Sequence, residues 1–140
     1  MAERLSEQLC FPLYACSKEI VRRYTPLLEP LDLTYTQYLV MKVLWEQETI
    51  SARDLGTTLY LDSGTLTPVL KRLEQKGLLS RQTNGKDRRI LDISITENGK
   101  LLQKKAEDPA ARLATCIHLA PEESQALCQL LDKMLQCLTE

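Results

Sequence analysis

The sequence of 140 residues has little of what enzymes and metalloproteins use for their chemistry. Its single histidine, His118, has no second imidazole with which to form a catalytic pair, and we expect it at the surface or at an interface. The five cysteines are an odd number, and their spacing fits neither a Cys-x-x-Cys metal or redox pattern nor a disulfide framework. No glycine-rich cofactor loop is present. The sequence therefore predicts no metal, no cofactor and no enzymatic activity.

Long apolar segments are also absent. No apolar run reaches the length that spans a membrane, and the N-terminus lacks the basic segment and apolar stretch of a secretory signal. Unpaired cysteines are typical of a reducing compartment, so we expect a cytoplasmic protein with no membrane partner. Glycine and proline are few and leucine is abundant, which favours one helical domain with a real core.

The net charge of −1 conceals an uneven distribution. Residues 71–89 carry seven basic and two acidic side chains, a local charge of +5 that leaves −6 for the rest of the chain. A basic face on an acidic body is typical of a DNA-binding protein. An ordinary solvated helix surface is the alternative that the charge pattern alone leaves open.

Capping residues divide the chain into short elements. Thr34 and Gln37 form a capping box that opens a helix, Ser51 and Asp54 form a second box, and Asp62 caps a helix that Gly77 ends. The expected elements are helices over 10–28, 34–47, 51–60 and 62–77, strands over 78–82 and 90–95 with a turn at Asn84-Gly85, a long helix capped by Thr96, and a last helix opened by Pro121. The faces expected to be buried are Leu13, Ile20, Val21 and Tyr24 in the first helix, and Leu66, Val69, Leu70 and Leu73 in the helix after Asp62.

The helices over 51–60 and 62–77 are joined tightly, as in a helix-turn-helix, and a basic hairpin follows them. This order predicts a mainly α fold with a small β-hairpin wing, in which the second helix enters the major groove with its N-terminal end first. Ser63, Thr65 and Thr67 lie at that end, where short hydroxyls reach phosphates or base edges, and Lys71 and Arg72 follow. Helix capping is the alternative role for the hydroxyls.

The stretch LDSGTLTPVLKRLE (61–74) resembles the recognition helix of MarR-family transcriptional regulators, and DRRILDISITENG (87–99) resembles the wing of that family. The resemblance implies a winged helix-turn-helix flanked by dimerisation helices. It also implies that the wing arginine, Arg89, enters the minor groove while Asp87 holds it. The candidate DNA-binding residues are Ser63, Thr65, Thr67, Lys71, Arg72, Lys86, Asp87, Arg88 and Arg89.

Cys10 is the candidate for redox chemistry. Pro12 follows it by two positions, and a proline is tolerated in the first turn of a helix, which allows a helix that begins at or near Cys10. There the thiol would face unpaired N–H groups and the positive end of the helix dipole, which favour the reactive thiolate. The alternative is a small buried apolar residue, which free cysteine often is.

The segment LCFPLY (9–14) resembles the organic-hydroperoxide-sensing (OhrR-like) branch of the MarR family. The resemblance implies that Cys10 is the peroxide sensor and that two tyrosines of the partner subunit, matched by spacing to Tyr24 and Tyr35, donate hydrogen bonds to its sulfur. Ordinary packing is the alternative role for both tyrosines. Tyr14, one helical turn from Cys10, is a possible third donor. Members of this branch usually carry an ordinary helix former at the position of Pro12. The proline therefore leaves the exact environment of the Cys10 thiol undetermined by the resemblance.

The other cysteines bear on the fate of an oxidised Cys10. The resemblance implies a resolving thiol from the C-terminal region of the partner subunit, and Cys116 lies near that position, with packing as its alternative role. Cys16 lies six residues along the helix, about 9 Å up the axis and out of disulfide range of Cys10. Cys128 and Cys137 are expected to be buried packing residues.

These observations predict a homodimeric repressor, with residues 1–32 and 96–140 forming a helical dimerisation region and residues 33–95 the DNA-binding region. Two recognition helices would bind a pseudo-palindromic double-stranded operator, and oxidation of Cys10 by an organic hydroperoxide would release it. One alternative is a MarR-type repressor controlled by a small phenolic or aromatic ligand. Another is a thiol enzyme that consumes peroxide, which steady-state turnover would reveal.

Overall fold

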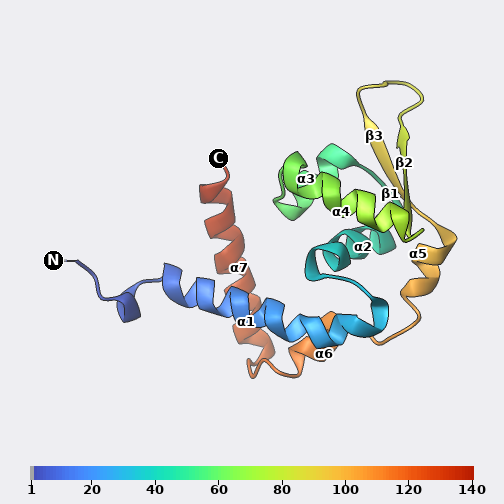
Figure 1. Ribbon diagram of the computed structural model, residues 1–140. Coiled ribbons are helices and arrows are strands. Elements are labelled where there is room, and N and C mark those ends of the chain that lie inside the picture. The colour runs from blue at the N-terminus through green and yellow to red at the C-terminus, as the bar shows by residue number, and fades with distance from the viewer. Residues whose placement is uncertain (1) are drawn as a thin grey trace.

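The computed structural model describes residues 2–140, and Figure 1 shows a mainly helical fold with one small sheet. The predicted fold class is confirmed. In chain order the elements are η1 Leu5–Glu7, α1 Cys10–Leu28, η2 Glu29–Leu31, α2 Tyr35–Gln47, β1 Thr49–Ser51, α3 Ala52–Leu59, α4 Ser63–Gln75, β2 Leu79–Thr83, β3 Leu91–Ile95, α5 Glu97–Leu102, α6 Pro109–Ala114 and α7 Pro121–Leu138.

The predicted helix starts are confirmed by hydrogen bonds to the first-turn N–H groups. Thr34 accepts from the Gln37 backbone N–H at 3.3 Å, and the Gln37 side chain accepts from the Thr34 N–H at 3.1 Å, which completes the capping box. Ser51 accepts from the Asp54 N–H at 3.1 Å and Asp62 from the Thr65 N–H at 2.7 Å. The predicted box at Ser51 and Asp54 is therefore present as an N-cap without the return bond from Asp54. These bonds satisfy donors that a helix leaves unpaired, so each helix begins where its capping residue stands.

The sheet has three antiparallel strands in the order β1-β3-β2. The hairpin of β2 and β3 was predicted within one residue at each end, but β1 was not predicted. Its three residues are too few to show alternation, and the strand exists because Ile50 pairs with Ile93 on β3, far along the chain. The central strand β3 therefore holds both the hairpin and the segment that leads into α3.

The predicted long helix after Thr96 is wrong. Helix α5 ends at Leu102, and a separate helix α6 begins at Pro109. Proline has no N–H for a helix interior and disfavours helical backbone in the residue before it, so Asp108 has a non-helical backbone, with φ −54° and ψ 120°, and caps α6 instead. The break turns the chain from the sheet toward the terminal helices.

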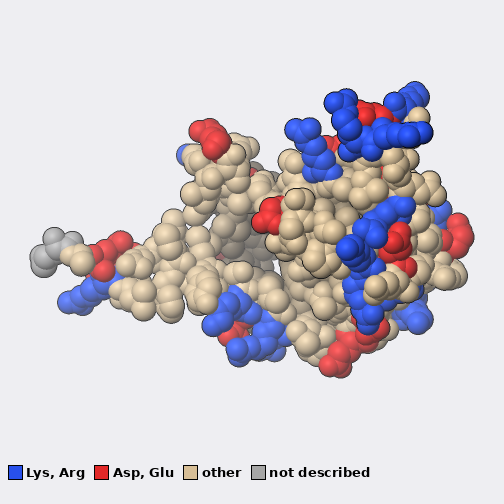
Figure 2. Space-filling model, turned by 45° about the horizontal axis from the view of Figure 1, so that its top comes forward, with Lys and Arg blue, Asp and Glu red and all other residues tan. Residues whose placement is uncertain are grey.

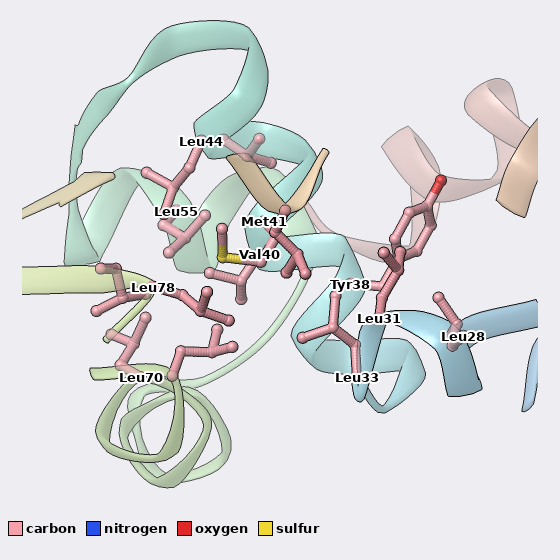
Figure 3. Packing of buried hydrophobic residues seen from close by; sticks show 14 of the residues in the cluster. Leu28, Leu31, Leu33, Tyr38, Val40, Met41, Leu44, Leu55, Leu70 and Leu78 are labelled. Carbon is pink, nitrogen blue, oxygen red and sulfur yellow. The ribbon is translucent and has the colours of Figure 1, made fainter. Parts of the chain in front are cut away.

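The core surrounds α2. Figure 3 shows Val40 and Met41 between two sides of the cluster, with Leu28 on the α1 side and Leu55 and Leu70 on the side of α3 and α4. The α4 face predicted to be buried is confirmed, because Leu66, Leu70 and Leu73 are at most 3% exposed and Val69 packs against them. In α1, Tyr24 is buried, Leu13 and Ile20 are partly buried, and the prediction for Val21 is wrong because it is 43% exposed.

Gly99 lies where α5 begins and packs so closely that no side chain fits. A Cβ there would meet the Leu78 carbonyl oxygen at 2.3 Å and an Ile95 side-chain carbon at 2.7 Å. Trp45 also donates its indole N–H to the Gly99 carbonyl oxygen at 2.8 Å. We expect Gly99→Ala to lower the free energy of unfolding by about 1–3 kcal/mol or more, measured by urea denaturation.

Gly85 is the matched control for this substitution. A Cβ at Gly85 has no neighbour within 4 Å, and the backbone there is not left-handed. Gly85→Ala should therefore leave the unfolding midpoint nearly unchanged. An equal loss of unfolding free energy in Gly99→Ala and Gly85→Ala would contradict the close packing at Gly99.

The N-terminal half of α1 and the whole of α7 project from the packed region (Figure 1). None of the 18 residues of α7 is buried, although the helix carries six leucines and methionines. Large apolar side chains are exposed on α1, on the segment before it, and on α7 with its leading loop; they are Leu5, Leu9, Phe11, Tyr14, Val21, Ile117, Leu119, Leu127, Leu130 and Leu138. Among the described residues no helix is both long enough and apolar enough to cross a membrane.

Candidate nucleic-acid interface and thiol site

A three-residue turn joins α3 to α4. Tyr60 ends α3 in the left-handed conformation with φ 57°, and the Leu61 N–H donates to the Gly56 carbonyl oxygen at 2.9 Å. A Cβ at Gly56 would stand 2.8 Å from the Leu61 carbonyl oxygen, so glycine is what lets the turn close. The predicted helix-turn-helix is thus present, with Asp62 capping its second helix.

Helix α4 buries one face and presents another to solvent. Thr65, Lys71 and Arg72 are exposed on the side away from Leu66 and Leu73, where a recognition helix meets DNA. The other two residues with predicted DNA-binding hydroxyls are exposed as well. Ser63 and Thr67 line a hollow of about 820 Å³ beside α3, and the Thr67 hydroxyl donates to the Ser63 carbonyl oxygen at 2.7 Å.

The hairpin loop holds its arginine as predicted. Asp87 accepts three bonds from Arg89, at 3.0 Å from the backbone N–H, 3.1 Å from Nε and 3.0 Å from a terminal nitrogen. The same contacts hold the pKa of Asp87 below its usual range. Arg89 is nevertheless largely exposed, because the pair fixes the direction of the guanidinium without covering it.

Asn84 shapes the loop that carries this pair. Its side-chain oxygen accepts from the N–H groups of Lys86 and Asp87 at 2.9 and 3.1 Å, and its amide donates to Asp92 at 2.8 Å. Lys86 and Arg88 are exposed beside it. Figure 2 shows Lys and Arg side chains gathered at the top, over the hairpin tip, with a second group below on the same face.

Cys10 is the first residue of α1, and its side chain is exposed. At 3.6 residues per turn, Cys10, Tyr14, Val21, Tyr24 and Leu28 fall on one stripe of the helix. Tyr24 and Leu28 are buried, whereas the three residues nearer the N-terminus are exposed. The sensor candidate therefore lies on the uncovered continuation of a buried face.

Tyr24 and Tyr35 are brought together, with ring centroids 4.7 Å apart and the rings stacked. Burial raises the pKa of both hydroxyls, which keeps them protonated and able to donate at neutral pH. Tyr24 follows Cys10 by 14 residues on the same straight helix, about 21 Å along the axis, so the two do not meet within one protomer.

Cys116 follows the end of α6 and is exposed, as are the other cysteines. The expectation that Cys128 and Cys137 are buried is wrong for this protomer, because α7 has no covering element here. His118 is exposed, as expected. No group of three His, Cys, Asp or Glu side chains within residues 2–140 is placed to hold a metal ion.

One polar cluster was missed by sequence reasoning. Asp108 accepts from the Tyr38 hydroxyl at 2.7 Å and from Lys42 Nζ at 2.8 Å, which ties α6 to α2. Burial would raise the pKa of Asp108, but these two bonds, the bond from the Ala110 N–H and the charge of Lys42 together hold the pKa below its usual range. Tyr38 and Lys42 share a face at i and i+4, but nothing in the sequence indicates a partner 66 residues away.

Comparisons with known proteins give a consistent result. A family model described as MarR family matches residues 33–91. The "Organic hydroperoxide resistance transcriptional regulator" of Bacillus subtilis is 45% identical over 96% of this chain and 92% of its own length. The "HTH-type transcriptional regulator SarZ" of Staphylococcus epidermidis is 42% identical over 88% of this chain and 83% of its own length.

Among solved structures, AbfR of Staphylococcus epidermidis is similar in several states. Its reduced and overoxidised forms, both bound to DNA, each give a TM-score of 0.79 at 36% identity, covering 98% of this chain and 96% of AbfR. The disulfide form gives a TM-score of 0.70 at the same sequence identity, covering 98% of this chain and 93% of AbfR. The protomer described here is thus more similar to the DNA-bound forms than to the disulfide form.

Proposed function

We propose a function that starts from the family of this chain, which belongs to the MarR family of DNA-binding transcriptional regulators. The protein is a homodimeric repressor. It is released from its operator when an organic hydroperoxide oxidises Cys10. The observation that carries the redox part is the position of Cys10. It opens α1 at the exposed N-terminal end of an apolar stripe whose other end, at Tyr24 and Leu28, is buried. A regulator of this kind acts in the cytoplasm, where the bacterial chromosome lies.

DNA binding is assigned to α4 and the hairpin. The exposed face of α4 enters the major groove, and Arg89, directed by Asp87, enters the adjacent minor groove, whose narrow form attracts a cation. Lys71, Arg72, Lys86 and Arg88 supply charge for the phosphates. The DNA-bound AbfR structures support this orientation through the shared fold.

Dimerisation is assigned to α1 and α7, which matches the proposed division into residues 1–32 with 96–140 and residues 33–95. Two copies would bury the exposed leucines of α7 and the uncovered stripe of α1 together. A helix with a wide apolar arc and no buried residue is unstable alone, so its partner must come from another chain. The second copy then places two recognition helices on successive major grooves of a pseudo-palindromic operator.

The same second copy completes the sensor. Tyr24 and Tyr35 lie too far from the Cys10 of their own chain, but a partner lying along the α1 stripe can bring its Cys10 to them. Their protonated hydroxyls would donate to the sulfur and stabilise the thiolate. The thiolate attacks the terminal oxygen of the hydroperoxide and the O–O bond breaks. The terminal oxygen with its proton stays on sulfur as the sulfenic acid, and the leaving alkoxide takes a proton from solvent to become the alcohol.

We assign the release step to a disulfide with Cys116 of the partner subunit. Attack of the Cys116 thiol on the sulfenic acid forms the S–S bond and expels water. Overoxidised AbfR is a DNA-bound form, which supports the view that oxygen on the sulfur is not by itself enough to displace DNA. The lower similarity of the disulfide form to this protomer agrees with a rearrangement on S–S formation.

Control by a small aromatic ligand has less support. The hollow between α2 and the α5–α6 connection, lined by Trp45 and Asp108 among others, measures about 30 Å³. Ligand pockets are about ten times larger, and this one is about the size of a water molecule. The hollow of about 820 Å³ beside α3 is large enough for a ligand, but Ser63 and Thr67 line it at the N-terminal end of α4, which is assigned to DNA.

The proposal is tested by binding to a fluorescent duplex, about three helical turns long, that the reduced wild-type protein has selected from a random-sequence pool. We expect tight binding before cumene hydroperoxide and loss of binding after it, with recovery on adding a thiol reductant. A wild-type protein that holds the duplex after complete oxidation of Cys10 to a disulfide would refute the redox part. Failure to select any duplex would refute the DNA-binding part.

Arg89→Ala tests the wing assignment separately. We expect it to cost about 1–3 kcal/mol of binding free energy, because the minor-groove contact and the positive charge that the narrow groove attracts are both lost. Fluorescence anisotropy against the same duplex measures the loss. Arg22→Ala, an exposed arginine on α1, removes equal charge away from the hairpin and should bind nearly as the wild type does.

A further inference from the structure

Glu74 in the last turn of α4 and Arg81 in β2 form a three-bond contact between the two DNA-binding elements. Arg81 donates from Nε at 3.2 Å and from a terminal nitrogen at 3.0 Å to one carboxylate oxygen of Glu74. Its backbone N–H donates to the other oxygen at 3.0 Å. Both side chains are partly buried, at 24% and 37% exposure for Arg81 and Glu74. The contact therefore uses the whole carboxylate and fixes backbone as well as side chain.

The charge of Glu74 is unexpected at this place. Glu74 and Asp87 are the two acidic residues in the basic segment 71–89, and the Asp87 carboxylate already has a partner in Arg89. The bonds from Arg81 hold the pKa of Glu74 below its usual range, so the carboxylate is charged at neutral pH. A negative charge between two phosphate-binding surfaces weakens the attraction to DNA. The Glu74 carboxylate therefore favours DNA binding only if it has a second, structural role.

The pair lies where the orientation of the hairpin is set. Beyond Gly77, which turns the chain in the left-handed conformation, β2 runs from Leu79 to Thr83 and leads to the loop that carries Arg89. Glu74 and Arg81 tie the middle of this strand to the C-terminal end of α4. Two guanidinium N–H groups on one carboxylate oxygen and a backbone N–H on the other fix the geometry of the contact more closely than a single charge pair does.

We propose that Glu74 and Arg81 are positioning residues that hold the hairpin at the angle to α4 at which Arg89 reaches the minor groove while α4 occupies the major groove. Neither side chain needs to touch DNA. The inference rests on the DNA-binding part of the proposed function and does not depend on Cys10. In this proposal the charge of Arg81 binds Glu74 and does not contact DNA. The side chains of Lys71 and Arg72 are exposed and can face phosphates.

Glu74→Gln tests the proposal through the sign of its effect. The glutamine keeps the size of the side chain but removes a negative charge next to the DNA, so electrostatics alone predicts tighter binding. The positioning role predicts weaker binding, by about tenfold for the reduced protein on the selected duplex. Glu19→Gln on α1 is the charge-matched control and should change affinity less than about twofold, on the order of a surface substitution.

A double-mutant cycle with Arg89→Ala separates positioning from general loss of structure. Glu74 and Arg89 bond to different partners, so independent effects would multiply. If the pair positions the hairpin, Arg89→Ala costs about tenfold in the wild-type background but about twofold or less in the Glu74→Gln background. Arg81→Gln in place of Glu74→Gln should give the same pattern.

Three outcomes would overturn the inference: tighter binding by Glu74→Gln, unchanged binding, or losses that multiply through the cycle. Circular dichroism melting of each variant, with binding measured well below the midpoint, ensures that a folded protein is compared. Failure of the wild type to bind any duplex is a failure of the proposed function and is seen before any variant is made.

Discussion

Leu130→Asp is expected to convert the protein into a monomer and to weaken its binding to the selected duplex by about 100- to 10,000-fold. Leu130 is 59% exposed on α7, a helix in which no residue is buried. An aspartate in the proposed interface would have to bury an unpaired charge, which association cannot tolerate. A monomer brings one recognition helix to a two-site operator and loses the effective concentration that a second linked helix provides.

Sedimentation equilibrium and fluorescence anisotropy measure the two effects on one sample. Gln129→Asp is the matched control, because it introduces the same charge one residue away on the polar side of α7, where residue 129 is exposed and no large apolar side chain is interrupted. The control should remain dimeric and bind the duplex. A Leu130→Asp protein that sediments as a dimer would show that α7 does not form the interface.

Local signals explain why the DNA-binding region was predictable from the sequence. Capping side chains such as Thr34 and Asp62 act within three residues, so their positions alone mark the helix starts. The Asp87–Arg89 contact spans two residues and was predicted through the family resemblance. The spacing of Leu66, Leu70 and Leu73 likewise places the buried face of α4 without tertiary information.

Features that depend on distant partners were not predictable. Strand β1 exists through its pairing with β3, and the Asp108 cluster joins segments 66 residues apart. Pro109 was available as a signal that the helix after Thr96 must break, since proline restricts the residue before it. The burial of Val21 was mispredicted for another reason, because its apolar stripe is left uncovered by the single chain.

Oxidation of Cys10 is the second change, after Leu130→Asp, for which we expect a large effect on DNA binding. Cumene hydroperoxide is expected to lower the affinity of the wild-type protein for its duplex by about 5- to 150-fold, the range typical of coupling between two sites. Cys10→Ser should keep its affinity, because serine forms no sulfenic acid. Cys116→Ser should also stay bound although its Cys10 is oxidised, because no disulfide forms. Cys16→Ser, exposed on the same helix, is the control and should respond as the wild type does.

The most direct test of the account tracks DNA release and cross-linking together as cumene hydroperoxide is added in steps. Anisotropy gives the fraction of duplex released, and intact mass without reductant gives the fraction of covalent dimer in the same samples. The account predicts that the two fractions rise together in the wild type and that neither rises in Cys10→Ser. Release of the duplex from Cys10→Ser at the same peroxide concentration would contradict it.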